Sequence, residues 1–304
     1  MAWVWGGVGL GVIFVVLPSV VHREDLLNLG ILIFLAVALA QSWNILGGYA
    51  GQVNLGHAAF FGAGALVTRT LWVGGVPLLL ALAAGALVAT AFGLVIGGPA
   101  FRLRGDYFAI GTLALAEILR ITVGNLLPEI STIPASALAG YDLRPRYYLA
   151  LGVAILSVVV MAILARSRLG LGMQAVREDE AAAEASGVGA FSHKLMALAI
   201  STSLAGLAGG VFAYYHVSYY PQHAFSPGWT FDALLIAFIG GVGTVHGPVL
   251  GALFYVILKE YLAVRLVEVH LLIFGILFIL VVLLLPGGLV EAWARARRLV
   301  YRAG

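Results

Sequence analysis

This sequence has few charged residues and no cysteine. Its 304 residues include 17 Lys or Arg and 14 Asp or Glu, so 10% are charged, against roughly 25% in an average soluble domain. A water-soluble protein of this size needs more hydrated surface than this, so the composition excludes that class. A net charge of only +3 excludes a nucleic-acid-binding chain, and the absence of cysteine excludes disulfides and thiolate metal sites.

Apolar residues are abundant instead, at 62% of the chain. About 20 helical residues cross a bilayer, and ten apolar runs approach or reach that length: 2–21, 27–47, 57–73, 76–98, 107–127, 146–165, 195–216, 229–243, 246–262 and 270–288. The runs are continuous rather than alternating, which disfavours a β-barrel. The first run lacks a basic segment before it, so we interpret it as a retained helix rather than a signal peptide. The sequence predicts an all-α polytopic membrane protein, a bundle of about ten transmembrane helices forming one domain over residues 1–304.

The basic residues predict how these spans are oriented, because Lys and Arg accumulate on the cytoplasmic side. With ten spans, both termini lie on the same side. Placing both in the cytoplasm puts ten of the seventeen basic residues there: Arg102, Arg104, Arg166, Arg168, Arg177, Lys194, Arg295, Arg297, Arg298 and Arg302. The others scatter near the opposite face, mostly singly: Arg23, Arg69, Arg120, Arg144, Arg146, Lys259 and Arg265.

The longest polar break, residues 166–194, gathers eight of the charged residues into one predicted cytoplasmic loop. Between Gly172 and Gly187 it reads as a short helix rich in Ala and Glu, too short and too charged to span a bilayer. Arg177 and Glu180 would share one face, and the alanines would form a smooth surface that another protein can approach closely. The alternative is a solvated helix that merely connects two spans.

A glycine-rich break, residues 47–57, falls between two predicted spans and carries Gln52, Asn54 and His57. Irregular backbone at membrane depth must be buried in protein or face water. The break therefore indicates either a broken or re-entrant helix lining a translocation pathway or a site of close helix packing. Aligning His57 with His246, an offset of 189 residues, superposes five identities, a hint that a second glycine-rich break plays a matching structural role.

Ionisable residues within spans are costly and are therefore candidates for function. Glu117 and Arg120 lie three apart, a spacing that permits pairing on one helix face. Asp232 begins the eighth span, where we expect it to cap the helix or face an outer vestibule, and Asp106 is expected to cap the fifth span.

Five stretches resemble the LivM-type permease of branched-chain amino acid importers, in that family's order and spacing. They are NILGGYAGQVNLGHAAFFGAGA at 44–65, RGDYFAIGTLALAE at 104–117, LGMQAVREDEAAAEASGV at 171–188, LAGLAGGVFAYY at 204–215 and GGVGTVHGPVLGA at 240–252. The resemblance implies the permease subunit of an ATP-binding-cassette importer in a bacterial or archaeal inner membrane. It implies no cofactor on this chain, with ATP and Mg²⁺ bound by partner subunits.

The resemblance also implies partners and sites. The expected partners are a LivH-type sister permease, two ATP-binding subunits of the LivG and LivF type, an extracytoplasmic solute-binding protein and membrane lipid. The segment at 171–188 would supply a coupling helix that docks on the ATPase, through Arg177, Glu178, Asp179, Glu180, Ala183, Glu184 and Gly187. The glycine-rich breaks and the charge within a span, rather than the resemblance, indicate the candidates for the translocation pathway or gate, which are Asn44, Gln52, Asn54, His57, Glu117 and His246.

One region departs from the family. Residues 128–145 read PEISTIPASALAGYDLRP, where relatives often carry a glycine-rich TGG…NGL-type segment. This predicted outer loop is where an importer of this family meets its binding protein, so the expected solute is a branched-chain amino acid or a related small polar molecule such as urea.

Missing motifs limit the remaining alternatives. The two lysines, Lys194 and Lys259, are not preceded by glycine, so the chain has no Walker A phosphate loop. No H-E-x-x-H or G-x-S-x-G string and no spacing typical of a metal site occurs, which leaves a membrane-embedded enzyme without a candidate centre. An ion- or proton-coupled secondary transporter stays open, with Glu117 as its candidate coupling carboxylate.

Overall fold

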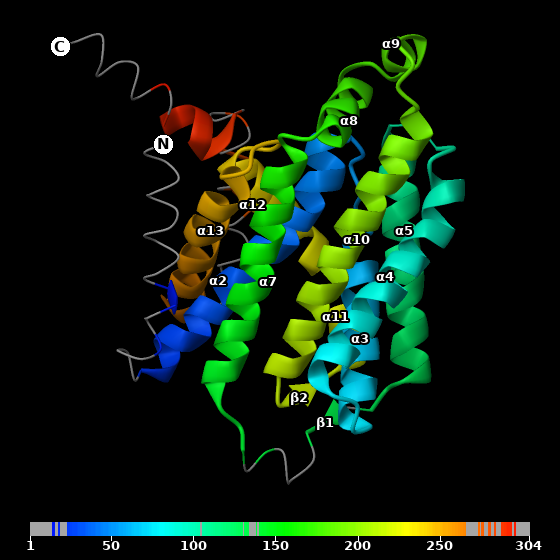
Figure 1. Ribbon diagram of the computed structural model, residues 1–304. Helices are drawn as coiled ribbons and strands as arrows, with labels where there is room; N and C mark the ends of the chain where they lie inside the picture. The colour runs from blue at the N-terminus through cyan, green and yellow to red at the C-terminus, as the bar shows by residue number, and fades with distance from the viewer. Residues whose placement is uncertain are drawn as a thin grey trace, which may run out of the picture.

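The computed structural model is a bundle of helices that run roughly alongside one another (Figure 1). It describes residues 23–103, 105–129, 131–133, 138, 140–265 and 287–293, together with residues 14, 15, 18, 273, 275, 276, 279, 280, 283 and 295. Most of the runs predicted at 2–21 and 270–288 lies outside the described residues, as do Arg104, Arg297, Arg298 and Arg302.

The described helices coincide closely with the predicted runs. In chain order they are α2 (Glu24–Trp43), the π-helix η1 (Asn44–Tyr49), α3 (His57–Val73), α4 (Leu78–Ala100), α5 (Asp106–Leu126), α7 (Leu143–Leu164), α8 (Arg168–Glu178), α9 (Glu180–Ala185), α10 (Ala190–Tyr215), α11 (Pro221–Ala224), α12 (Gly228–Gly240) and α13 (Gly247–Arg265). The predicted all-α class is confirmed.

Five of the described helical segments are long and apolar enough to cross a bilayer: Glu24–Tyr49, Leu78–Ala100, Asp106–Leu126, Leu143–Leu164 and Ala190–Tyr215. They make the chain a multi-pass membrane protein. The 13 residues of α12 extend only about 20 Å at 1.5 Å each, less than the hydrocarbon thickness. The predicted number of ten spans and the predicted side of the termini therefore stay predictions.

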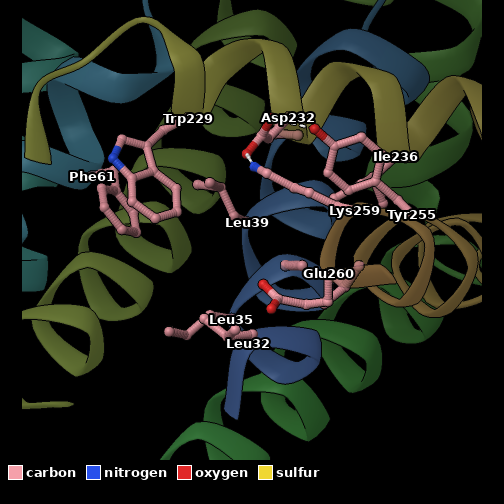
Figure 2. Close-up of a pocket in the computed structure, with 13 residues that line it drawn as sticks. Leu32, Leu35, Leu39, Phe61, Trp229, Asp232, Ile236, Tyr255, Lys259 and Glu260 are labelled. Carbon is pink, nitrogen blue, oxygen red and sulfur yellow. Dashed lines mark hydrogen bonds and ion pairs between the residues drawn. The ribbon is translucent and has the colours of Figure 1, made fainter. Parts of the chain in front are cut away.

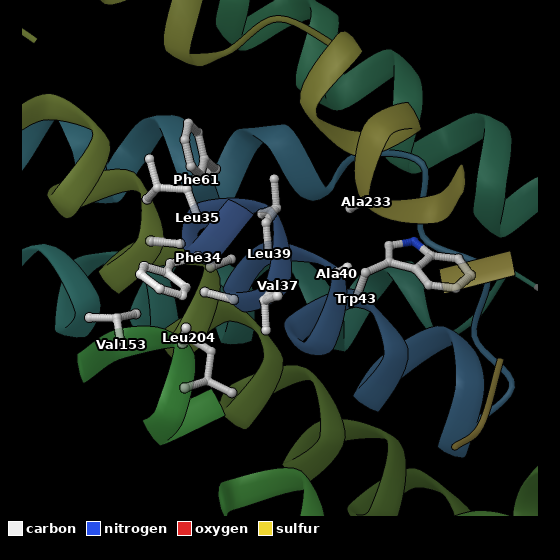
Figure 3. Packing of buried hydrophobic residues seen from close by; sticks show 14 of the residues in the cluster. Phe34, Leu35, Val37, Leu39, Ala40, Trp43, Phe61, Val153, Leu204 and Ala233 are labelled. Carbon is white, nitrogen blue, oxygen red and sulfur yellow. The ribbon is translucent and has the colours of Figure 1, made fainter. Parts of the chain in front are cut away.

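Helix α2 is the centre of the bundle. It packs against α7, α10, α12 and α13, and its apolar residues are buried along most of its length (Figure 3). The ring of Phe34 meets the ring of Tyr147 edge-on at 5.2 Å, joining α2 to α7. Because lipid tails are as apolar as these side chains, the packing gain comes from close fit rather than from removing water.

Helices α3, α4 and α10 approach closely where glycines face one another. A Cβ placed on Gly64 of α3 would lie 2.2 Å from the carbonyl oxygen of Gly206 on α10, and one on Gly209 would lie 1.9 Å from that of Phe61. Only glycine permits these backbone contacts, the usual role of small residues between membrane helices. Gly97 near the end of α4 lies beside Leu198 near the start of α10, and Gly210 near the end of α10 lies beside Leu82 near the start of α4, so these two helices run antiparallel.

The two ends of the bundle differ in what closes them. Helices α8 and α9 lie at the end that we name the loop end (Figure 1). The opposite, strand end carries β1 (Ser131–Thr132) and β2 (Ser218–Tyr219), which pair antiparallel with Ser131 opposite Tyr219. The strands join the segment after α5 to the segment after α10.

Candidate functional site

The polar loop between α7 and α10 holds two helices rather than the single one predicted between Gly172 and Gly187. α8 begins at Arg168, capped by the Ser167 hydroxyl, and the backbone turns extended at Asp179. The Asp179 carboxylate accepts a hydrogen bond from Ala182 N and caps α9. A residue that favours helix N-caps therefore divides the predicted helix, because its side chain satisfies amides that a new helix start exposes.

Helix α9 ends at Ala185, and Gly187 follows its C-cap Ser186, as predicted for a glycine after the helix. Gly187 has a φ of +83°, and Val188 N bonds to the Ala183 carbonyl while Gly187 N bonds to that of Glu184. This pair of bonds is the Schellman arrangement, in which glycine adopts the left-handed conformation at little cost.

The break at Asp179 separates Arg177 from Glu180, so the prediction that both share one helix face is wrong. Glu180 forms an ion pair with Lys194 on α10, with Oε2 and Nζ 2.6 Å apart. Val176 and Ala183 are buried beside Ala190 and thus hold the two short helices against α10. The exposed surface of the loop is formed by other residues, among them Ala175, Glu178, Ala182, Glu184 and Ala185.

Arg177 turns in the opposite direction, into the glycine-rich break that follows α2. Its Nη1 donates a hydrogen bond to the carbonyl oxygen of Gly48 in η1. A Cβ built on Gly51, whose φ is +70°, would lie 2.9 Å from Arg177 Cγ and 3.2 Å from its Cα. Glycine is therefore required at residue 51 both for its backbone conformation and for the approach of α8.

Asn44 joins this first break, residues 44–56, to a second one, residues 240–247. Its Oδ1 accepts from Gly243 N at 2.8 Å, and its Nδ2 donates to the Thr244 carbonyl at 3.0 Å. Gln41 Nε2 adds a bond of 2.6 Å to the Val245 carbonyl. We name the two breaks together the glycine junction. The two segments that sequence self-similarity linked are in direct contact, although about 200 residues separate them.

The irregular backbone of the first break is satisfied by polar side chains. Asn54 Oδ1 accepts from Gly56 N, Thr112 Oγ1 from Leu55 N and Thr230 Oγ1 from Ala58 N. The last of these bonds supplies an acceptor to the first turn of α3, whose amides lack intrahelical partners. Thr112 and Thr230 carried no sequence signal for this role, since they lie 57 and 172 residues from the amides that they serve.

The other predicted pathway residues have different surroundings. His57 is fully buried with its Nε2 2.7 Å from Ser42 Oγ, and Gln52 Nε2 donates to the nearby Ala50 carbonyl. His246 is exposed at the start of α13. The structure thus gathers Asn44, Gln52, Asn54, His57 and His246 around the glycine junction.

Glu117 lies apart from this group, on α5. Its two carboxylate oxygens accept from Nε and Nη2 of Arg120, which confirms the predicted pair. The expected cap at Asp106 is wrong, and so is the capping alternative for Asp232, whose other alternative, an outer vestibule, stays a prediction. Gly105 rather than Asp106 is the N-cap of α5, and Asp232 binds Tyr255 and Lys259 instead of capping α12, whose N-cap is Pro227.

The strand end is held by Arg69, an α3 residue that we expected among the scattered basic residues near the face opposite the cytoplasmic loop. It is buried, with an exposed fraction of 1%, and it donates five hydrogen bonds, whose acceptors are Ser131 Oγ and the carbonyl oxygens of Ser131, Ala213, His216 and Val217. Carbonyl dipoles therefore replace the carboxylate that a buried guanidinium usually binds. Burial raises the pKa of the neighbouring Tyr219 phenol, which keeps that hydroxyl neutral.

Comparison with known proteins places this architecture in a family. Residues 25–282 match the family model described as branched-chain amino acid transport system / permease component. The chain belongs to this permease family. Its members are transport components rather than enzymes, and in the part of the chain that the structure describes no three His, Asp or Glu side chains gather to hold a metal ion.

Individual relatives agree with this membership. The high-affinity branched-chain amino acid transport system permease protein LivM of Escherichia coli (strain K12) is 31% identical, over 93% of this chain and 73% of its own length. The probable LivM permease of Methanocaldococcus jannaschii is 26% identical over 67% of this chain and 66% of its own. The autoinducer 2 import system permease protein LsrC of an Enterobacter species (strain 638) is 32% identical over 59% of this chain and 53% of its own. No solved structure matches the chain.

Proposed function

We propose that this chain is the membrane-spanning permease subunit of an ATP-driven importer that carries branched-chain amino acids into the cell. Its partners would be a sister permease, two ATP-binding subunits that hold ATP and Mg²⁺, and an extracytoplasmic binding protein that delivers the solute. The setting would be the inner membrane of a bacterium or an archaeon. The matches to LivM permeases support the solute class.

The single observation that carries the mechanism is the hydrogen bond from Arg177 to Gly48. The exposed acids Glu178 and Glu184 on α8 and α9 are the surface offered to an ATPase. Because Val176, Ala183 and the Glu180–Lys194 pair fix both short helices to α10, a push on the loop moves them as a unit. Arg177 then transmits that displacement to the glycine junction.

The junction is suited to act as the moving part. Gly51, Gly241 and Gly243 all have positive φ values, and the two breaks are joined by side-chain bonds from Asn44 and Gln41 rather than by continuous helix. Segments with few regular backbone bonds open at lower free energy than helices do. Closure of an ATPase dimer would thus switch the side to which the junction opens.

Reconstitution tests this proposal. The complete set of subunits in proteoliposomes is expected to accumulate leucine, isoleucine or valine only when ATP reaches the ATP-binding subunits and the binding protein is present. ATP-dependent uptake of urea without amino-acid uptake would contradict the solute class, and leucine uptake by this chain without ATPases would contradict the whole mechanism.

A Glu117→Gln variant separates the proposal from ion-coupled secondary transport. Because Glu117 is half-exposed and paired with Arg120 on its own helix, removing its charge is expected to change ATP-driven uptake by less than about twofold, as for surface ion pairs. Secondary transport through Glu117 requires instead that uptake driven by an ion gradient be lost in this variant.

A further inference from the structure

A pocket opens between α2, α12 and α13, on the strand-end side of the glycine junction (Figure 2). It has an empty volume of about 610 Å³, including the open solvent at its mouth. Tyr215 at the strand end of α10 bonds to Asn28 near the start of α2, so α2 runs from the strand end toward the junction, and its pocket residues precede Asn44.

One wall of the pocket carries charge. Asp232 Oδ2 lies 2.8 Å from Lys259 Nζ, and Asp232 Oδ1 accepts a hydrogen bond from the Tyr255 hydroxyl. Asp232 uses one of the three N–H donors of the Lys259 ammonium. Glu260 is exposed and forms no ion pair with the residues that the structure describes. Figure 2 shows its carboxylate directed into the space between the Asp232–Lys259 pair and Leu35.

The opposite wall is apolar. Leu32, Leu35 and Leu39 project from successive turns of α2, and Ile236 faces them from α12. Phe61 and Trp229, whose rings stack at 4.8 Å, close one side. The pocket therefore combines an ammonium, two carboxylates and a branched aliphatic surface within one space.

We propose that this pocket binds an α-amino acid zwitterion with a branched aliphatic side chain as it passes through the protein. The Glu260 carboxylate would receive the ammonium of the amino acid, the free N–H groups of Lys259 would receive its carboxylate, and the leucines of α2 would pack against its side chain. The assignment rests on the proposed function, whose solute it locates. A neutral solute such as urea would form no ion pair with the Glu260 carboxylate or the Lys259 ammonium.

The helices that form the pocket also reach the glycine junction. α2 continues into η1, and α12 and α13 are joined by the second break, residues 240–247. A displacement of the junction would therefore reach the pocket through α2, α12 and α13 together. Binding and the state of the junction would then depend on each other through the same helices.

Equilibrium binding of radiolabelled L-leucine tests the pocket directly, in nanodiscs that hold the complete membrane assembly without the binding protein. Glu260→Gln is expected to weaken leucine binding about tenfold or more, the typical effect of one lost charged hydrogen bond. It should also abolish the preference for leucine over 4-methylpentanoate, which lacks the ammonium. Lys259→Gln should abolish the preference for leucine over L-leucinol, which lacks the carboxylate.

The control is Glu291→Gln, which removes a half-exposed carboxylate paired with Arg295 outside the pocket and should leave binding unchanged. A purely structural role of the Asp232–Lys259 pair would weaken all three compounds equally. If Lys259→Gln does not fold, Glu260→Gln still decides, because Glu260 is exposed and supports no ion pair among the described residues.

Measuring uptake by the complete system distinguishes a failure of the pocket proposal from a failure of the importer proposal. Leucine uptake and binding that are both unchanged in Glu260→Gln and Lys259→Gln would overturn the pocket and leave the importer standing. A complete system that transports no amino acid would overturn both.

Discussion

The loop end and the strand end of this bundle use arginine in opposite ways. At the strand end, Arg69 is buried and donates five hydrogen bonds that tie α3 to β1 and to the segment after α10. At the loop end, Arg177 is 40% exposed in its side chain and donates one hydrogen bond, to a glycine carbonyl in a helix break. Many bonds at one end fix the structure, whereas one bond at the other end can follow a moving loop.

The largest expected effect is a loss of stability when the strand end is altered. Arg69→Met should destabilise the protein by roughly 4 kcal/mol, because several buried carbonyl groups lose their donor. The measurement is the thermal unfolding midpoint of the purified chain, with the exposed Arg144→Met as the control. Equal midpoints for the two variants would show that the strand end does not depend on Arg69.

Glycine substitutions sharpen the contrast. Gly51→Ala places a methyl group 2.9 Å from Arg177 Cγ at a φ of +70°, whereas Gly75→Ala meets nothing within 4 Å at a φ of +91°. Both variants carry backbone strain of about 1–2 kcal/mol, but only the first also pushes α8 away from the junction. Transport assays should therefore show loss of uptake for Gly51→Ala and near-normal uptake for Gly75→Ala. Similar losses in both would assign the effect to backbone strain alone.

Removing the hydrogen bond from Arg177 to Gly48 at the loop end should affect transport more than stability. Arg177→Met should lower stability by about 1 kcal/mol, typical of one hydrogen bond to a charged group that is part-exposed. ATP hydrolysis by the complete transporter should continue while leucine uptake per ATP falls about tenfold. The exposed Arg168→Met on the same helix is the control, and an unchanged uptake per ATP in Arg177→Met would remove Arg177 from the mechanism.

The smallest expected effect is on the loop itself. Asp179→Ala removes the cap of α9 and should cost about 1 kcal/mol, confined to that helix. Hydrogen exchange of the α9 amides should speed up about fivefold, while α10 and the strand end keep their protection. Ser186→Ala, at an exposed position after α9, should leave exchange unchanged, and uniform acceleration in both variants would contradict a local role for the cap.

The sequence predicts the bounds of the long described helices well, because each helix depends on its own apolar run. A glycine-rich break was expected at residues 47–57 and a matching one around His246, since glycine with polar residues cannot continue a lipid-facing helix. The structure begins the first irregular segment three residues earlier, at Asn44. The contact between Asn44 and Gly243 was not predicted in detail, because it depends on how α2, α12 and α13 pack. A sequence pattern contains no information on how close two residues come when they are far apart along the chain.

One error and one unpredicted feature have the same origin. The divided loop helix and the buried Arg69 each depend on where a side chain finds its partner. Asp179 caps α9 from within an acidic run that also reads as continuous helix, and Arg69 binds carbonyl groups that lie as far as 148 residues away. Charge counting placed Arg69 near the face opposite the cytoplasmic loop, and the structure does put it at the strand end, but charge counting cannot register the backbone acceptors that let it be buried there.

The most direct test of the Arg177 link is a distance measured between spin labels at Leu250→Cys, on the first turn of α13 beside the junction, and at Arg144→Cys, at the strand end. The chain has no cysteine of its own, so these labels are its only ones when the partner subunits are cysteine-free. In the complete transporter the distance is expected to change when ATP binds, and Arg177→Met is expected to abolish that change. An ATP-dependent change that persists at full size in Arg177→Met would contradict the account.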